Sequence, residues 1–152
     1  MAAQPADHPT VQVFDEIRRI DNATRAAISE ELPKGLTFAQ YEVLSLLARR
    51  GDGFTPAEIA RAVQVAKSGL TNTLQRLESG RLARVEPCGK DGRKKRVWLT
   101  PEGRAAYQQT MAGVRPKMDH LKESFTTEEF REALPFLKAL SAWFEERGWE
   151  NV

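Results

Sequence analysis

The chain has 152 residues, of which 41% are hydrophobic and 29% charged, values typical of a globular protein. One cysteine excludes an internal disulfide, and two distant histidines provide no cluster with the spacing of a metal site. No apolar run reaches the roughly 18 residues of a membrane span, and the first ten residues lack the pattern of a secretory signal. We therefore expect a cytoplasmic protein with no cofactor and no metal.

Positive charge is concentrated in one segment. The whole chain has a formal net charge of +2, but between Arg61 and Arg104 there are 11 Lys and Arg against 4 Asp and Glu, a net charge of +7. The rest of the chain therefore carries −5. Such a concentration is typical of a phosphate-binding surface, although a basic face that is only solvated remains the alternative when charge alone is considered.

Two helices are predicted in the first third of the chain. Apolar residues recur every three or four positions from Thr10, and Pro33 ends this first helix. Its apolar stripe is sparse, which favours packing on a surface supplied partly by another subunit. The second helix begins at the N-cap Thr37 and ends at Arg50, before two glycines. Because it is apolar nearly all round, we expect it at the centre of the fold.

A helix-turn-helix is predicted next. Thr55 and Glu58 form a capping box around Pro56, which predicts a short helix over residues 56–63. A longer helix over residues 66–79 places three leucines on one stripe, and that stripe is expected to be buried. Its opposite face carries side chains of the kinds that contact base edges and phosphates, although ordinary solvent-facing residues are the alternative: Lys67, Ser68, Thr71, Asn72, Gln75 and Arg76.

A hairpin with a basic tip follows. Residues 82–86 alternate as a strand does, residues 96–99 predict a second strand, and the turn formers between them include four cations. Such a wing can lie along the DNA backbone or insert an arginine into the minor groove. Asp91 could hold the guanidinium of Arg93 by a charge-assisted hydrogen bond. The predicted DNA contacts of the wing are Lys90, Asp91, Arg93, Lys94 and Lys95.

The C-terminal third predicts a surface for a partner. Thr100 and Pro101 start a helix whose apolar residues alternate spacings of three and four, as in a coiled coil, and Pro116 should kink or break it. After a capping box at Thr126, the last helix reaches about Arg147 and is apolar on two sides, of which a monomer can cover one. The residues expected at a dimer interface are Val13, Ile17, Ile20, Met111, Val114, Met118, Leu121, Phe136, Leu140 and Trp143.

Four segments together match a known pattern: Leu36–Tyr41, Glu58–Ala60, Leu74–Leu82 and, most specifically, Asp91–Gly103, with its Asp-x-Arg followed by Leu-Thr-x-x-Gly. On these segments the chain resembles the MarR (multiple antibiotic resistance regulator) family of bacterial transcription factors over residues 12–147. The resemblance implies a mainly α (α+β) fold in one domain, 1–152. A winged helix-turn-helix at 37–103 would lie between dimerisation helices at 10–33 and 104–147.

The family resemblance also implies a function. It indicates an intertwined homodimer that binds a pseudo-palindromic operator in double-stranded DNA and is released by a small, often aromatic or anionic ligand bound between the dimerisation and winged-helix regions. The family's ligand pocket has no dependable motif, so no pocket residues are predicted. No phosphate-cradling glycine loop or nucleophile motif indicates an enzyme. We therefore expect a ligand-responsive repressor that does not act at a membrane.

Two alternatives remain at this stage. The first is a winged helix used as a protein-interaction module without sequence-specific DNA binding, which the charge distribution disfavours. The second is a redox-responsive regulator that acts through Cys88, because Arg84 and Lys90 nearby could lower the pKa of its thiol. A small residue in a turn is the favoured interpretation of Cys88.

Overall fold

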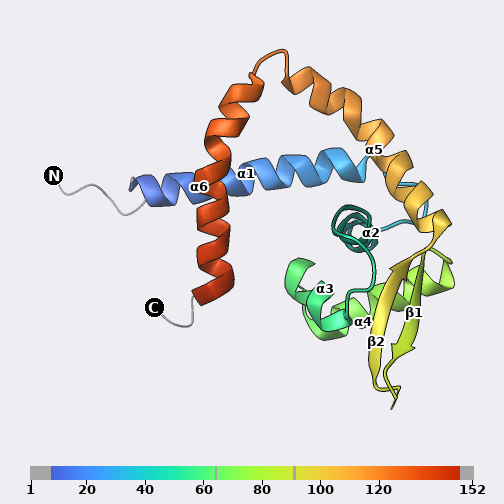
Figure 1. The fold of residues 1–152 in the computed structure, drawn as a ribbon. Helices are drawn as coiled ribbons and strands as arrows, with labels where there is room; N and C mark the ends of the chain where they lie inside the picture. The colour runs from blue at the N-terminus through green and yellow to red at the C-terminus, as the bar shows by residue number, and fades with distance from the viewer. Residues whose placement is uncertain (1–7, 64, 91, 148–152) are drawn as a thin grey trace. The chain divides into compact units, whose positions relative to one another are not determined.

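The computed structural model describes residues 8–63, 65–90 and 92–147, so Asp91 of the predicted wing lies outside the described residues. Helices dominate, and one antiparallel strand pair forms a hairpin that projects from them (Figure 1). The mainly α fold class with a small sheet is confirmed. The elements in chain order are α1 (Pro9–Ser29), α2 (Phe38–Arg50), α3 (Pro56–Val63), α4 (Lys67–Ser79), β1 (Ala83–Cys88), β2 (Lys94–Leu99), α5 (Pro101–Leu121) and α6 (Thr127–Arg147).

The chain forms two compact units, which divide within α5 between Val114 and Arg115. This division lies next to Pro116, where the sequence predicted a kink or a break. The helix is not broken there, since α5 continues through Pro116 to Leu121. A proline removes one helical hydrogen bond but leaves those of the neighbouring turns in place.

Among the described residues, no helix has both the length and the apolar character that crossing a membrane requires.

The core of the first unit is built around α2. Val43, Leu44 and Leu47 of this helix are almost completely buried, as expected for a helix that is apolar nearly all round. They belong to one cluster with the three leucines of α4 and with Val97 of β2. The helix-turn-helix and the wing therefore share a single hydrophobic core, so neither is an independent appendage.

The predicted helix starts are confirmed in their hydrogen bonds. The backbone N–H of Thr55 donates to Glu58 Oε2 (2.8 Å), and Glu58 N–H donates back to Thr55 Oγ1 (3.2 Å). The same reciprocal pair joins Thr126 and Glu129 at the start of α6, and Thr37 caps α2. Each cap satisfies backbone donors that a helix leaves unpaired at its first turn.

The strands of the wing are longer than the sequence predicted. The ladder runs from the pair Ala83 and Leu99 to the pair Cys88 and Lys94. Residues 87, 88, 94 and 95 therefore belong to strands and not to the turn. Pro87 did not end β1 because an edge strand tolerates a proline whose missing N–H faces away from its partner strand.

The start of α5 is fixed against the turn that follows α4. Thr100 Oγ1 accepts from Gly103 N–H (2.9 Å) and donates to the carbonyl of Arg81 (2.7 Å). Gly80 is the C-cap of α4, and Arg81 after it has the positive φ of this turn (59°). A Cβ at position 103 would overlap the carbonyl oxygen of Leu82 and lie 2.9 Å from a methyl carbon of Leu99. The Thr-x-x-Gly spacing is therefore a packing requirement.

Replacement of Gly103 by alanine should destabilise the protein by about 1–3 kcal/mol, because the added methyl group meets backbone that cannot yield without moving α5. Urea unfolding measures this loss. Gly69→Ala is the matched control, since a Cβ at position 69 of α4 meets no atom within 4 Å. The control should keep its stability or gain up to about 1 kcal/mol. Equal stabilities of the two variants would contradict the packing account.

Candidate nucleic-acid interface

Helix α4 presents a polar face to solvent. Leu70, Leu74 and Leu77 point into the core, and all the residues predicted to contact DNA on this helix are exposed on its other sides: Lys67, Ser68, Thr71, Asn72, Gln75 and Arg76. The hydroxyl of Thr71 donates to the carbonyl of Lys67 (2.9 Å). The structure thus brings the six side chains onto one accessible helix surface.

The N-terminus of α4 differs from the other helix starts. Its N-cap is Ala66, and no side chain of the described residues accepts from its first backbone N–H groups. Its first turn also contains no acidic residue. Exposed N–H groups and the positive end of the helix dipole favour an anionic group such as a phosphate. This end of α4 is therefore suited to the DNA backbone.

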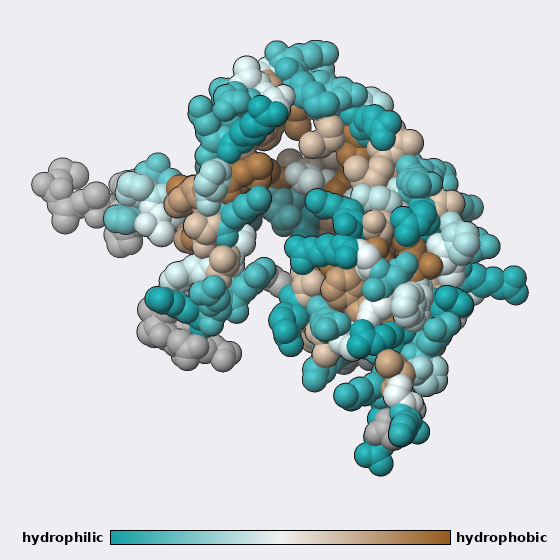
Figure 2. Space-filling model, in the orientation of Figure 1, coloured by the Kyte–Doolittle hydropathy of each residue, from teal (hydrophilic) through white to brown (hydrophobic). Residues whose placement is uncertain are grey.

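The wing carries the other predicted contacts. Lys94 and Lys95 lie on β2, and Lys90 and Arg93 lie in the turn, all of them exposed. The end of the hairpin is mostly hydrophilic in Figure 2. Gly89 and Gly92 have positive φ angles of 91° and 64°, which the turn between the strands requires. The predicted contact between Asp91 and Arg93 lies outside the described residues.

Strand β2 has a second neighbour that the sequence did not reveal. Gly53 N–H donates to the carbonyl of Val97, and Val97 N–H donates to the carbonyl of Phe54, both at 2.9 Å. The segment Asp52–Phe54, which we name the wing anchor, thus acts as a short third strand. The sequence indicated only a helix stop here, because glycines on both sides of Asp52 are an ordinary turn signal.

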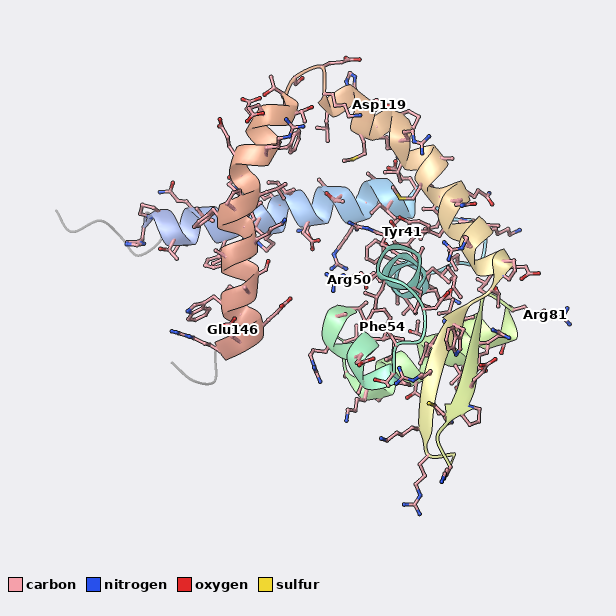
Figure 3. All side chains as sticks on the ribbon, in the orientation of Figure 1. Tyr41, Arg50, Phe54, Arg81, Asp119 and Glu146 are labelled. Atoms are coloured by element: carbon pink, nitrogen blue, oxygen red, sulfur yellow. The ribbon has the colours of Figure 1, made fainter. Side chains whose placement is uncertain are left out.

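Two side chains extend this contact. Arg96 Nη1 donates to the carbonyl of Gly53 (2.6 Å), and the backbone N–H of Leu99 donates to Asp52 Oδ1 (2.7 Å). Neither Asp52 nor Arg96 was among the predicted site residues. Phe54, labelled in Figure 3, lies between the end of α2 and β2.

Cys88 lies at the end of β1, half-buried and opposite Lys94 in the ladder, and not in the turn where the sequence placed it. Its position in a strand, opposite a residue of the partner strand, accounts for Cys88 as part of the fold without a redox role.

Within residues 8–63, 65–90 and 92–147, no group of His, Cys, Asp and Glu could hold a metal ion.

A cavity of about 660 Å³ lies between α1, α2 and the end of α3 with the link that follows it. Tyr41 and Arg50, both labelled in Figure 3, line it from α2. Sequence reasoning named no pocket residues, since the lining comes from three separate segments. The remaining lining residues are Asp21, Thr24, Arg25, Ile28, Phe38, Glu42, Ser45, Leu46, Arg49, Ala62, Val63 and Val65.

Arg25 is the arginine of this cavity that lies next to both of its acids, Asp21 and Glu42. Arg25 Nε contacts Asp21 (2.7 Å), its Nη2 lies 3.5 Å from Glu42, and its guanidinium lies 4.9 Å from the ring centre of Phe38. Burial raises the pKa of Glu42 above its usual range, and Arg25 opposes that shift. Burial likewise raises the pKa of Tyr41.

Two further cations line the same cavity. Arg49 and Arg50 at the end of α2 have no carboxylate partner within 4.0 Å among the described residues. Asp21 and Glu42 lie next to Arg25, so the lining has three arginines against two acids and keeps an excess of positive charge. An anion that entered the cavity could therefore pair with Arg49 and Arg50.

Apolar side chains remain exposed on both units. On α1, Ile20 is 64% exposed; on α6, Phe136 is 60% exposed, and no residue of α1 or α6 is buried. Of the residues predicted at a dimer interface, Val13, Ile20, Met118, Leu121 and Phe136 are exposed and Ile17, Leu140 and Trp143 are half-buried.

The other two residues predicted at a dimer interface pack within their own chain. Val114 is 5% exposed, and the sulfur of Met111 accepts a hydrogen bond from the hydroxyl of Tyr41 (3.6 Å). The ring of Tyr41 also stacks on Tyr107 (6.2 Å between centres). The first part of the α5 heptad pattern therefore serves the core of the first unit, and it leaves no surface at Val114 for a partner.

A helix-turn-helix that shares its core with a basic two-stranded hairpin defines a winged-helix DNA-binding protein. A sequence model of the MarR family matches residues 34–94. The transcriptional regulator HosA of Escherichia coli O127:H6 is 31% identical over 114 residues, which cover 75% of this chain and 80% of HosA. The chain belongs to the MarR family.

Two further relatives agree with this assignment. The HTH-type transcriptional repressor YetL of Bacillus subtilis is 29% identical over 113 residues, 74% of this chain and 66% of YetL. The crystal structure of a MarR-family regulator from Silicibacter pomeroyi superposes with a TM-score of 0.76 and 26% identity, covering 99% of both chains. The protein is thus a DNA-binding transcriptional regulator and not an enzyme.

Proposed function

We propose that the protein is a homodimeric repressor that acts in the cytoplasm on a pseudo-palindromic operator and leaves it when a small ligand binds. One observation carries the proposal: the exposed polar face of α4 and the basic wing share one core and belong to the segment with a net charge of +7. A repressor that covers a promoter blocks it by occupancy alone, so no catalytic group is needed.

In this proposal α4 reads base edges and the wing holds the DNA backbone. The exposed Ser68, Asn72 and Gln75 can donate and accept hydrogen bonds in the major groove. Arg93 enters the flanking minor groove, where a narrow A·T-rich stretch has enhanced negative potential. Two copies related by a two-fold axis place two α4 helices in major grooves about 34 Å apart.

The exposed apolar residues support a second copy as the partner. Large apolar side chains on α1 and over the second unit would remain in water in a monomer, and monomers rarely expose so many. A palindromic operator requires two-fold symmetry, which a homodimer supplies with the same surfaces on both copies. The proposed surface contains Val13, Ile17, Ile20, Met111, Met118, Leu121, Phe136, Leu140 and Trp143, without Val114, which is buried in its own chain.

Operator affinity should fall by about 10³–10⁵-fold between 50 and 200 mM salt if 6–10 phosphates are contacted. The Lys and Arg side chains of the protein displace counterions from the DNA, and this release is less favourable at higher salt. The measurement is fluorescence anisotropy on DNA selected from a random pool. Arg93→Ala should weaken binding about tenfold or more. Arg18→Ala, which removes an exposed arginine of α1 paired with Asp15, is the control and should bind normally. An affinity independent of salt, or unaffected by Arg93→Ala, would refute the wing assignment.

The cavity supports the proposed ligand response. It lies between α1, which carries exposed apolar residues, and α2 and α3, which position α4. The aromatic rings of Phe38 and Tyr41 suit a flat ligand, and the unpaired cations suit a carboxylate, which an arginine can bind with two hydrogen bonds. We propose a small aromatic acid as the effector class.

Arg49→Ala should reduce the response to such an acid. A panel of benzoate derivatives would be titrated into the protein–operator complex. The best compound should release the Arg49→Ala variant only at a concentration at least about tenfold higher than the concentration that releases the wild type. The reason is that a lost charged hydrogen bond costs on the order of 1.5–3 kcal/mol. Arg19→Ala, outside the cavity on α1, should respond as wild type. An unchanged response of Arg49→Ala to a compound that releases the wild type would exclude this site.

A further inference from the structure

Besides the shared core, the wing is attached to the helix-turn-helix by hydrogen bonds along one edge of β2. The wing anchor exchanges two backbone hydrogen bonds with Val97, both at 2.9 Å. Asp52 and Arg96 add one bond on either side of this pair, to Leu99 and Gly53. Four hydrogen bonds thus join two segments that are more than 40 residues apart in the sequence. A rigid hairpin held on four successive bonds has little freedom to tilt.

The two side-chain bonds are the stronger ones. Each involves a charged group, the guanidinium of Arg96 at 2.6 Å and the carboxylate of Asp52 at 2.7 Å, and both bonds are partly buried. Charged donors and acceptors form shorter and stronger hydrogen bonds than neutral ones, and partial burial reduces screening by salt. The side chains therefore contribute more to the attachment than their number suggests.

Arg96 also lies close to the start of α3. Glu58 has its pKa lowered first by the hydrogen bond from Thr55 N–H and additionally by the positive charges of Arg96 and Arg61. Arg96 thus donates a hydrogen bond to a carbonyl of the wing anchor, and its charge also favours the ionised form of the acidic cap of α3. Lys94, Lys95 and Arg96 are all exposed on β2, but only Arg96 of the three has a hydrogen bond from its side chain to the wing anchor among the described residues.

We propose that Asp52 and Arg96 are positioning residues for DNA binding, which hold the wing at a fixed angle to α4 so that both bind one DNA segment at once. This inference rests on the proposed function. When two contacts are held rigidly at the correct spacing, the second forms at a high effective concentration, and this advantage is lost when the geometry loosens. Neither residue needs to touch DNA for its loss to weaken binding.

Because Asp52 is acidic, the direction of the change in operator affinity on its replacement distinguishes positioning from simple charge attraction. Removing an acidic residue from a DNA-binding surface should strengthen binding if only Coulomb attraction matters. We expect Asp52→Ala instead to weaken operator binding about tenfold, since it removes a charge-assisted hydrogen bond that holds the wing. Asp52→Asn retains an oxygen acceptor and should bind nearly as wild type. Glu78→Ala, an exposed acid on α4, is the control and should bind equally well or better.

A double-mutant cycle separates positioning from general destabilisation. If Asp52 acts through the wing, Asp52→Ala should cost much less affinity in an Arg93→Ala background, where the main wing contact is already absent. Additive losses would overturn the inference, as would an affinity of Asp52→Ala equal to or above that of the wild type. Circular dichroism and thermal unfolding confirm that each variant is folded at the assay temperature.

Arg96 provides a test that does not depend on Asp52. If Arg96 contacts one phosphate directly, Arg96→Met should reduce the slope of log affinity against log salt by about one. If it positions the wing, the slope should fall by more than one, because Arg93, Lys94 and Lys95 lose their contacts together. A fall of one or less would overturn the positioning role. Failure of the wild type to bind any selected DNA would instead refute the proposed function.

Discussion

Strand β2 is held on both edges, by β1 on one side and by the wing anchor on the other, and the interface depends on this constraint. The pairing buries Val97 in the same cluster as the leucines of α4. The relative position of the wing and the polar face of α4 is therefore set by one core and not by a flexible linker. A basic hairpin joined only through its turns would carry the same charge but could not present it at a fixed distance from α4.

The same region connects the wing to the rest of the chain. Thr100 and Gly103 fix the start of α5 against the turn after α4, so the helix that follows β2 cannot swing without moving Arg81 and Leu82. On the other side, only Gly51 separates Arg49 and Arg50 of the cavity from the wing anchor in the sequence. A ligand that draws these arginines inward would pull on the segment that holds β2. In the proposed function, a ligand in the cavity would thus act on the position of the wing through a short stretch of backbone.

Local signals predicted much of the fold. The threonine caps and the leucine stripe of α4 depend on residues within a few positions of one another, and both were found as expected. The basic turn was also predicted from local signals, but it is shorter than expected because residues 87, 88, 94 and 95 belong to the strands. Sequence reasoning missed the wing anchor, the cavity and the packing role of Gly103, because these arise from segments brought together only by folding. The heptad pattern of α5 was ambiguous for a related reason: an apolar seam looks the same whether it faces a partner or, as at Val114, its own core.

In the proposed complex two copies bind one operator, each with α4 in the major groove and the wing in the adjacent minor groove. Hydroxyl-radical footprinting on DNA selected from a random pool tests it most directly. We expect two symmetric half-sites with centres about 10–10.5 base pairs apart. Each half-site should be flanked by minor-groove protection that disappears with Arg93→Ala. A single unsymmetrical footprint, or flanking protection that persists without Arg93, would contradict it.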